Sequence, residues 1–247
     1  MKKVGRKRLD LLVVERGLAE TRQKAAAMIL AGEVSVDGVP VSKAGAAVSD
    51  TARVDVNSRL QKYASRGGLK LEGALEDFHV EVAGKVCLDL GASTGGFTDC
   101  LLQHGALRVF AVDVNVTQLA WKLQQDARVV RIQKNARDLR VTDLPGLVDL
   151  AVADVSFISV TKVLVPAVTC ARPGADFLIL VKPQFELRRQ DVGRGGIVTD
   201  KALHIRAAES VRRAAEAAGL ETLGLQPSRL AGAEGNQEYF LHLRKRA

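Results

Sequence analysis

The sequence lacks an apolar run long enough to cross a membrane. No stretch approaches the roughly 18 apolar residues that a spanning helix requires, and the basic start, residues 1–8, is not followed by the apolar segment of a secretory signal. Cysteine is also scarce. Cys87, Cys100 and Cys170 are odd in number and lack C-x-x-C spacing, which favours buried thiols over a disulfide or a zinc site. We therefore expect a cytoplasmic protein with no membrane segment and no metal.

The composition favours two domains with different tasks. A chain of 247 residues with 47% hydrophobic content can bury one large core and a small one. Residues 1–70 hold 14 Lys and Arg against 7 Asp and Glu, whereas residues 71–247 hold 22 against 21. A basic first domain predicts a polyanion partner, and a near-neutral second domain predicts chemistry. The alternative is a basic surface that serves only solubility.

A glycine-rich turn at residues 89–98 is the strongest local signal. An apolar run at 86–90 predicts a buried strand before it, and apolar residues at helical spacing from 97 to 104 predict a helix after it. The next predicted strand, residues 109–112, ends on Asp113, an acid placed to hold the hydroxyls of a ribose. The turn matches neither the dinucleotide nor the nucleotide triphosphate glycine pattern. A tight strand-to-helix connection without a ligand is the alternative.

An acid followed by Gly-x-Ser-x-Gly-Gly resembles motif I of S-adenosylmethionine-dependent methyltransferases. The resemblance implies S-adenosyl-L-methionine as cofactor, with Asp89 at its methionine end, the glycines beneath it, and Asp113 on the ribose. It also places Asn135 near the adenine. The residues expected to bind the cofactor are Asp89, Gly91, Ser93, Gly95, Gly96, Phe97, Asp113, Asn135 and Asp154.

The first 60 residues predict two short helices and a hairpin. The first helix runs over residues 8–16 and is closed by Gly17; the second is capped by Thr21 and ended by Gly32; Asp37-Gly38 forms the hairpin turn. This pattern resembles the S-four-type RNA-binding domain, a small α+β fold. The resemblance implies a basic surface for structured RNA. Its expected RNA-binding residues, with one from the start of the second domain, are Arg6, Lys7, Arg8, Arg16, Arg22, Lys24 and Arg66.

The rest of the chain alternates between strands and helices. Beyond those already given, strands are predicted at 129–132, 148–154, 175–181, 222–226 and 238–243, and helices at 65–78, capped by Ser65, and at 118–123, 163–170 and 200–218. This order predicts an α/β fold with a doubly wound, mostly parallel sheet. We place the domains at residues 1–60 and 61–247, with a polar linker at about 57–65.

Four ionisable residues fall at element ends that such a sheet brings to one edge: Lys70, Asp154, Lys182 and Glu238. Methylation of a ribose hydroxyl needs a stronger nucleophile than a neutral alcohol, and a neutral amine can accept the proton. A lysine, with an ordinary pKa of about 10.4, must be partly buried or lie beside a like charge to serve. Lys70 could be that like charge for Lys182. The alternative for Lys70 is a solvated surface lysine.

This Lys-Asp-Lys-Glu order resembles the tetrad of FtsJ-type ribose 2′-O-methyltransferases, and the whole chain is similar to the TlyA family. The matching stretches are residues 65–71, 88–98, 153–159, 180–186 and 235–238. The resemblance implies a Rossmann-like class I methyltransferase domain that methylates cytidine 2′-hydroxyls in ribosomal RNA, with Lys182 as proton acceptor. Asn115-Val116-Thr117 departs from the family, which more often has glycines there. The end of the chain soon after the last strand favours the large ribosomal subunit as substrate.

Three alternatives come from other functional classes. Family members often carry the label haemolysin, which makes a membrane-active protein one alternative, although the basic residues lie on short, polar-capped helices. A catalytically silent RNA-binding assembly factor is another. A pseudouridine synthase can carry the same N-terminal module but does not explain residues 89–97. The sequence leaves open the target nucleotide, the oligomeric state, and whether free RNA or an assembled subunit is bound.

Overall fold

The computed structural model describes residues 5–19, 21–56, 62–232 and 234–246. The chain divides into two compact units, Met1–Lys62 and Tyr63–Ala247, each of which is described by itself. The predicted linker at 57–65 falls partly on residues 57–61, outside the described residues.

The described residues of the first unit form two helices and five short strands. Helices α1 (Leu9–Glu15) and α2 (Arg22–Leu30) pack through Leu9, Val13 and Ile29, all fully buried. The Thr21 side chain caps α2, as predicted, by accepting a hydrogen bond from Lys24 N. The predicted hairpin, β2 (Val34–Val36) and β3 (Val39–Pro40), is also confirmed. Three strands were not predicted: β1 (Arg6–Arg8), β4 (Ala47–Ser49) and β5 (Val54–Val56).

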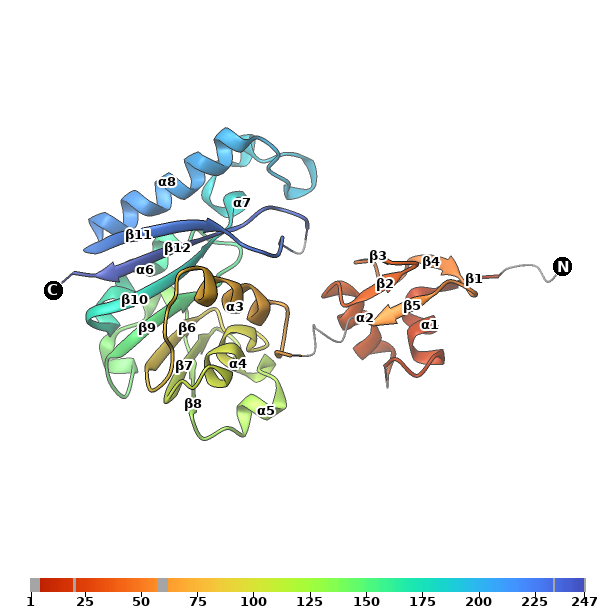
Figure 1. The fold of residues 1–247 in the computed structure, drawn as a ribbon, viewed down its shortest axis with the longest axis horizontal. Coiled ribbons are helices and arrows are strands. Elements are labelled where there is room, and N and C mark those ends of the chain that lie inside the picture. The colour runs from red at the N-terminus through yellow and green to blue at the C-terminus, as the bar shows by residue number, and fades with distance from the viewer. Residues whose placement is uncertain (1–4, 20, 57–61, 233, 247) are drawn as a thin grey trace. The chain divides into compact units, whose positions relative to one another are not determined.

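The second unit is built on a seven-stranded sheet in the order β11-β12-β10-β9-β6-β7-β8 (Figure 1). Its strands are β6 (Val86–Leu90), β7 (Arg108–Asp113), β8 (Val129–Gln133), β9 (Val148–Ala153), β10 (Ala171–Val181), β11 (Leu220–Pro227) and β12 (Tyr239–Lys245). Strands β6 to β10 are parallel, whereas β12 is antiparallel to both β10 and β11. The strand order reverses between β6 and β9, so a ligand crevice is expected at their carboxyl ends.

Helices cover both faces of this sheet, which confirms the doubly wound fold. Helices α6 (Thr161–Cys170) and α8 (Lys201–Ala217) share one core cluster with alternate strand residues such as Leu88 and Ile179. Helices α3 (Gly67–Asp77) and α4 (Gly96–Gln103) share the second core cluster with the strand residues that point to the opposite face, such as Cys87 and Leu178. Side chains of a strand alternate between faces, so both faces of a central strand are buried.

Two predictions about helices were wrong. Ser65 does not cap α3, whose N-cap is Arg66; the position of the Ser65 hydroxyl against Gly96 explains this. The helix predicted at 118–123 is instead a 3₁₀ turn, Val116–Gln118, followed by α5 (Trp121–Gln124). The break occurs because Leu119 and Ala120 are extended and Ala120 N donates a hydrogen bond to Thr94 O at 3.0 Å.

The cysteine prediction is confirmed, since Cys87, Cys100 and Cys170 are buried and free. Within the described parts of the chain, no helix is both long and apolar enough to span a membrane.

Candidate active site

Gly91 brings the loop after β6 against the loop after β9. Its φ of +85° is in the left-handed region, and a Cβ there would lie 2.6 Å from the carbonyl oxygen of Asp154. Only glycine fits such an approach without a backbone shift. The next residues then turn so that Ser93 N donates a hydrogen bond to Asp113 Oδ2 at 2.9 Å. The glycine turn thus joins three strand ends.

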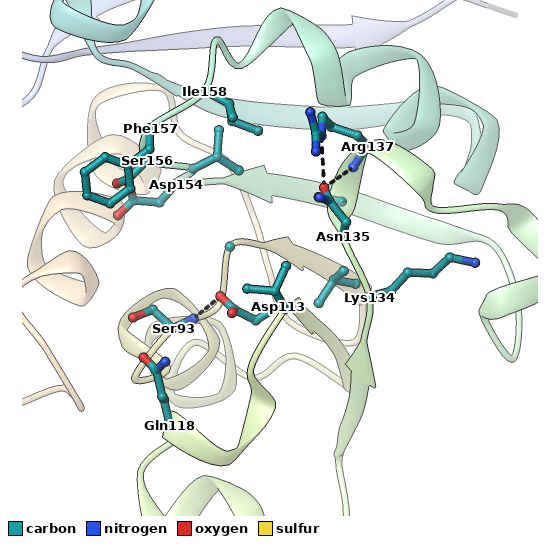
Figure 2. A pocket seen from close by; sticks show the side chains of 15 residues that line it. Ser93, Asp113, Gln118, Lys134, Asn135, Arg137, Asp154, Ser156, Phe157 and Ile158 are labelled. Atoms are coloured by element: carbon teal, nitrogen blue, oxygen red, sulfur yellow. Dashed lines mark hydrogen bonds between the residues drawn. The ribbon is translucent and has the colours of Figure 1, made fainter.

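These strand ends enclose a cavity of about 430 Å³. Figure 2 shows Ser93 and Asp113 on one side, Asn135 and Arg137 on another, and Asp154 with Ser156 and Phe157 opposite. The full lining is Gly91, Ser93, Val112, Asp113, Val114, Gln118, Lys134, Asn135, Ala136, Arg137, Asp154, Val155, Ser156, Phe157 and Ile158. Its size is that of a site for a nucleoside-sized ligand.

The polar groups of this cavity suit an adenosine. Asp113 uses one lone pair of each oxygen on backbone donors, Ser93 N and Asn115 N, both at 2.9 Å. A carboxylate has about four acceptor positions, so two remain for a pair of hydroxyl groups. Asn135 Oδ1 accepts hydrogen bonds from Arg137 N at 3.1 Å and Nε at 3.3 Å. That bond fixes Asn135 at the cavity wall.

Asp89 lies beneath the turn as a fully buried carboxyl group. Its Oδ2 accepts a hydrogen bond from Thr98 Oγ1 at 2.6 Å, while Oδ1 is buried without a hydrogen-bond partner in the described part of the molecule. Burial raises the pKa of Asp89 to about 7. An orphaned carboxylate oxygen is a fitting partner for the ammonium group of S-adenosyl-L-methionine, so the residues present fit that cofactor.

Four of the residues predicted to bind the cofactor do not line the cavity. One is Asp89, which is fully buried, and the other three contact other parts of the protein. A Cβ on Gly95 would lie 2.1 Å from Leu123 Cδ1, and one on Gly96 would lie 2.2 Å from Ser65 Oγ. Phe97 is buried and stacks on Phe240, with ring centroids 6.1 Å apart. These residues pack α4 against its neighbours.

The four residues of the predicted tetrad form two ion pairs. Lys70 Nζ lies 2.5 Å from Glu238 Oε2, and Lys182 Nζ lies 2.6 Å from Asp154 Oδ1. Lys182 Nζ donates its hydrogen bond to Ser156 Oγ at 2.8 Å. Its interaction with Asp154 Oδ1 is therefore an electrostatic contact without hydrogen-bond geometry. The side chains of Lys70 and Lys182 are each only 10% exposed, which argues against solvated surface lysines.

Close packing holds the Lys70–Glu238 pair in place. A Cβ on Gly68 would lie 2.3 Å from the ring of Tyr63, so α3 can approach only because this position is glycine. Across from it, a Cβ on Gly232 would lie 2.7 Å from Glu238 Oε1. Removing one partner of a pair buried in this way leaves an uncompensated charge.

Phe157 was not predicted from the sequence as a site residue, although it lies in a matched stretch. It is 89% exposed at the cavity wall, and its φ of +67° is rare for a bulky side chain. Its ring lies 5.6 Å from that of Phe185, which in turn lies 5.9 Å from Lys182 Nζ. Other lining or supporting residues that were missed are Thr98, Gln118, Lys134, Arg137 and Ser156.

Most of the predicted RNA-binding residues make contacts within the first unit. Asp10, nearly buried, accepts hydrogen bonds from Arg8 and Arg22, and the Arg8 guanidinium holds the pKa of Asp10 well below its usual range. Arg16 donates to the backbone of Asp50 and Ala52. These guanidinium groups remain about half exposed where they pair with Asp10, so they can also meet phosphates.

The other predicted RNA-binding residues differ in place. Lys7 pairs with Glu15, and Arg6 donates to Ala47 O; both are exposed on β1. Lys24 lies in the first turn of α2. Arg66 belongs to the second unit, where it donates a long hydrogen bond to Ala231 O at 3.4 Å. In the described residues, no group of three or more His, Cys, Asp or Glu could hold a metal ion.

Comparison with known proteins matches both units. Residues 63–245 match the FtsJ-like methyltransferase family and residues 7–54 match the S4 domain. The chain is 50% identical to the 16S/23S rRNA (cytidine-2′-O)-methyltransferase TlyA of Mycobacterium tuberculosis, over 97% of this chain and 90% of that protein. It is 33% identical to the 23S rRNA (cytidine-2′-O)-methyltransferase TlyA of Campylobacter jejuni, over 79% and 75%. Among solved structures, a putative hemolysin from Streptococcus thermophilus matches with a TM-score of 0.77 and 40% identity, over 99% and 90%.

Proposed function

From the fact that this chain belongs to the FtsJ-like methyltransferase family and, within it, to the TlyA proteins, we propose that it methylates cytidine 2′-hydroxyls in ribosomal RNA with S-adenosyl-L-methionine. One observation carries this proposal. Asp154 both lines the cavity that fits the cofactor and lies 2.6 Å from Lys182 Nζ. A methyl donor in the cavity and a base at Lys182 would therefore both lie next to the carboxylate of Asp154.

Asp113, Asn135 and Asp89 would hold S-adenosyl-L-methionine, which would supply an electrophilic methyl group for transfer from its sulfur to the ribose oxygen. Lys182 Nζ, in its neutral amine form, accepts the proton of the 2′-hydroxyl, which makes that oxygen a stronger nucleophile. Asp154 stabilises the resulting ammonium, and Ser156 Oγ orients it. The buried Lys70–Glu238 pair keeps a second amine at the same edge of the sheet.

Phe157 is proposed to receive the target base. A ribose hydroxyl can reach a cavity wall only if its nucleotide leaves the RNA stack, and unstacked bases are commonly held on aromatic rings. Phe157 is a large exposed ring on that wall, paired with Phe185 at 5.6 Å. Its strained backbone is consistent with a position retained for binding rather than for stability.

Large-subunit RNA is the proposed first substrate, because 23S rRNA is named for both TlyA relatives. Primer extension at low nucleotide concentration on 16S and 23S RNA, from a deletion strain and from the strain with the gene restored, tests the proposal. We expect at least one cytidine stop in 23S RNA that depends on the gene and on Lys182. Identical patterns in both strains would refute the methyltransferase proposal.

A further inference from the structure

A second cavity, of about 370 Å³, lies beside α7 (Pro183–Glu186) and α8. It is lined by Glu186, Leu187, Arg188, Gln190, Asp191, Arg206, Ser210 and Arg213. Arg206, Ser210 and Arg213 are spaced by four and three residues, so they project from one face of α8. The reaction proposed above uses none of the side chains on this wall.

The charge of this cavity is not neutralised from within. Of its three arginines, Arg206 forms an ion pair with Asp191. In the described part of the chain, Arg188 and Arg213 form no salt bridge or side-chain hydrogen bond, and both are exposed. Glu209, one helical turn before Arg213, interacts with it only through its charge. Two guanidinium groups on one concave wall favour an anion, and a planar guanidinium can bind phosphate through two parallel hydrogen bonds.

Glu186 and Asp191 offset this charge only in part, because the lining holds three arginines against two carboxyl groups, and the loop after β9 holds the carboxylate of Glu186. Oε2 accepts a hydrogen bond from Ser159 Oγ at 2.5 Å and Oε1 accepts one from Val160 N at 2.8 Å. Burial also raises the pKa of Glu186. Glu186 thus links the wall of this second cavity to the loop on which Ser156 and Phe157 lie.

The cavity also lies close to the proposed reaction. Lys182 directly follows β10, and the single turn of α7 after it leads to Glu186, roughly 6 Å along a helix axis. Figure 1 shows α7 and the start of α8 at the edge of the sheet where the parallel strands end. An RNA strand that presents a nucleotide to Lys182 must continue along this edge.

We propose that the cavity lined by Arg188, Arg206 and Arg213 binds a backbone phosphate of the substrate RNA near the target nucleotide. The inference rests on the proposed function, since it assumes an RNA substrate at Lys182. A phosphate contact fixes the register of the strand without reading its sequence. The second unit would thus hold its own RNA anchor, beside the reaction and distinct from the basic residues of the S4 domain.

The test compares two double variants of the full-length protein. Arg188→Gln/Arg213→Gln removes the unpaired guanidinium groups of the cavity. Arg108→Gln/Arg246→Gln is the control, because it removes the same charge from exposed arginines at the start of β7 and just after the end of β12, at the opposite edge of the sheet. Affinities for a deproteinised 23S transcript and for assembled large subunits are measured from 50 to 300 mM salt. Calorimetry with the cofactor checks that each variant is folded.

We expect the cavity variant to bind the transcript more weakly than the control, with a salt slope smaller by about 1.4–1.8, because each lost phosphate contact releases fewer counterions. Cofactor affinity and the single-turnover rate at saturating RNA should match those of the control. Equal RNA affinity for both variants would overturn the inference. So would a loss seen only with assembled subunits, which would place an acidic ribosomal protein in the cavity.

This experiment separates the inference from the function on which it rests. If the unmodified protein methylates the transcript and the two variants behave alike, only the phosphate site is wrong. If the unmodified protein methylates neither transcript nor subunits, the proposed function itself fails.

Discussion

At the scale of single residues, Asp154 joins the cofactor cavity to the buried lysine. It belongs to both because Gly91 approaches its carbonyl oxygen while its carboxylate faces Lys182. Each amine of the tetrad is thereby matched by one acid, so two lysines can be nearly buried at one sheet edge at a tolerable cost. The chemistry then depends on removing a proton at Lys182, and substitutions there are the most direct test.

Lys182→Ala should lower the single-turnover methylation rate by about 10²–10⁴-fold, the range for a lost general base. Binding of cofactor and RNA should change little, because neither depends on the proton transfer. Lys162→Ala, at an exposed lysine of α6, is the matched control and should keep the full rate. A Lys182→Ala enzyme as fast as this control would remove Lys182 from the mechanism.

Cofactor affinity should depend on the ionisation of Asp89. Burial raises its pKa to about 7 in the free protein, so the carboxyl contributes to stability at pH below about 3.9 and that contribution is lost as the pH rises to 7. A bound ammonium favours the carboxylate. The affinity for S-adenosylhomocysteine should therefore rise between pH 6 and 8, with proton release visible when calorimetry is run in two buffers.

Asp89→Asn serves as the control for this dependence, since it keeps the shape and the acceptor for Thr98 but cannot ionise. Its affinity should be weaker and flat over the same pH range. An equal pH dependence in both proteins would show that another group is being titrated.

Phe157 provides a third test at this scale. Phe157→Ala should reduce kcat/KM for RNA by roughly 5- to 150-fold, the equivalent of about 1–3 kcal/mol of base stacking. Phe157→Trp should retain most of the activity because the stacking surface remains. Cofactor affinity should not separate the two variants. If alanine and tryptophan proved equally active, Phe157 would have no role in holding the base.

At the scale of elements, the sequence predicts the parallel strands well and the small ones poorly. Strands β6, β7, β9 and β10 carry apolar runs because both of their faces are buried, and this pattern is readable. Strands β1, β4 and β5 have three residues each, which is too short to show an alternation. The break between residues 118 and 121 depends on a bond from Ala120 N to Thr94 O, which no local pattern reveals.

The same limit applies to the site. The predicted strand ends indicated that Asp113, Asp154 and Lys182 lie at one edge of the sheet, because the carboxyl ends of parallel strands meet at the same edge. Which acid pairs with which lysine depends on how the loops pack. Loop packing also decides which glycines of the turn line the cavity and which contact neighbouring helices. Ser156 and Phe157 carry no signal of their own, because an exposed aromatic residue looks like a core residue in the sequence.

Gly91 tests the strand ends as an element. Gly91→Ala should lower the free energy of unfolding by roughly 1–3 kcal/mol, because the backbone is left-handed and the new methyl group would meet Asp154 O at 2.6 Å. Cofactor affinity should fall as well. Gly146→Ala, which would place its methyl group in open space, should change stability by less than about 0.5 kcal/mol. Chemical denaturation with and without cofactor measures both; similar losses in the two variants would contradict the packing argument.

At the scale of the whole molecule, the basic charge occurs in two places with different surroundings. In the first unit, Arg8, Arg16 and Arg22 also stabilise the fold through Asp10 and the backbone, so their removal would confuse binding with stability. Arg6 and Lys7 lie exposed on β1 and can be changed without disturbing that network. In the second unit, Arg188 and Arg213 are the corresponding exposed pair.

Both places should contribute to RNA binding independently. Arg6→Gln/Lys7→Gln should reduce the salt slope of RNA affinity by about 1.4–1.8. Combining it with Arg188→Gln/Arg213→Gln should give about twice that reduction, because each phosphate contact releases its own counterions. The slope is measured with a 23S transcript, and the single-turnover rate at saturating RNA should stay constant throughout. If the four substitutions together reduced the slope no more than one pair, the two units would not engage the RNA at the same time, and recognition would belong to a single unit.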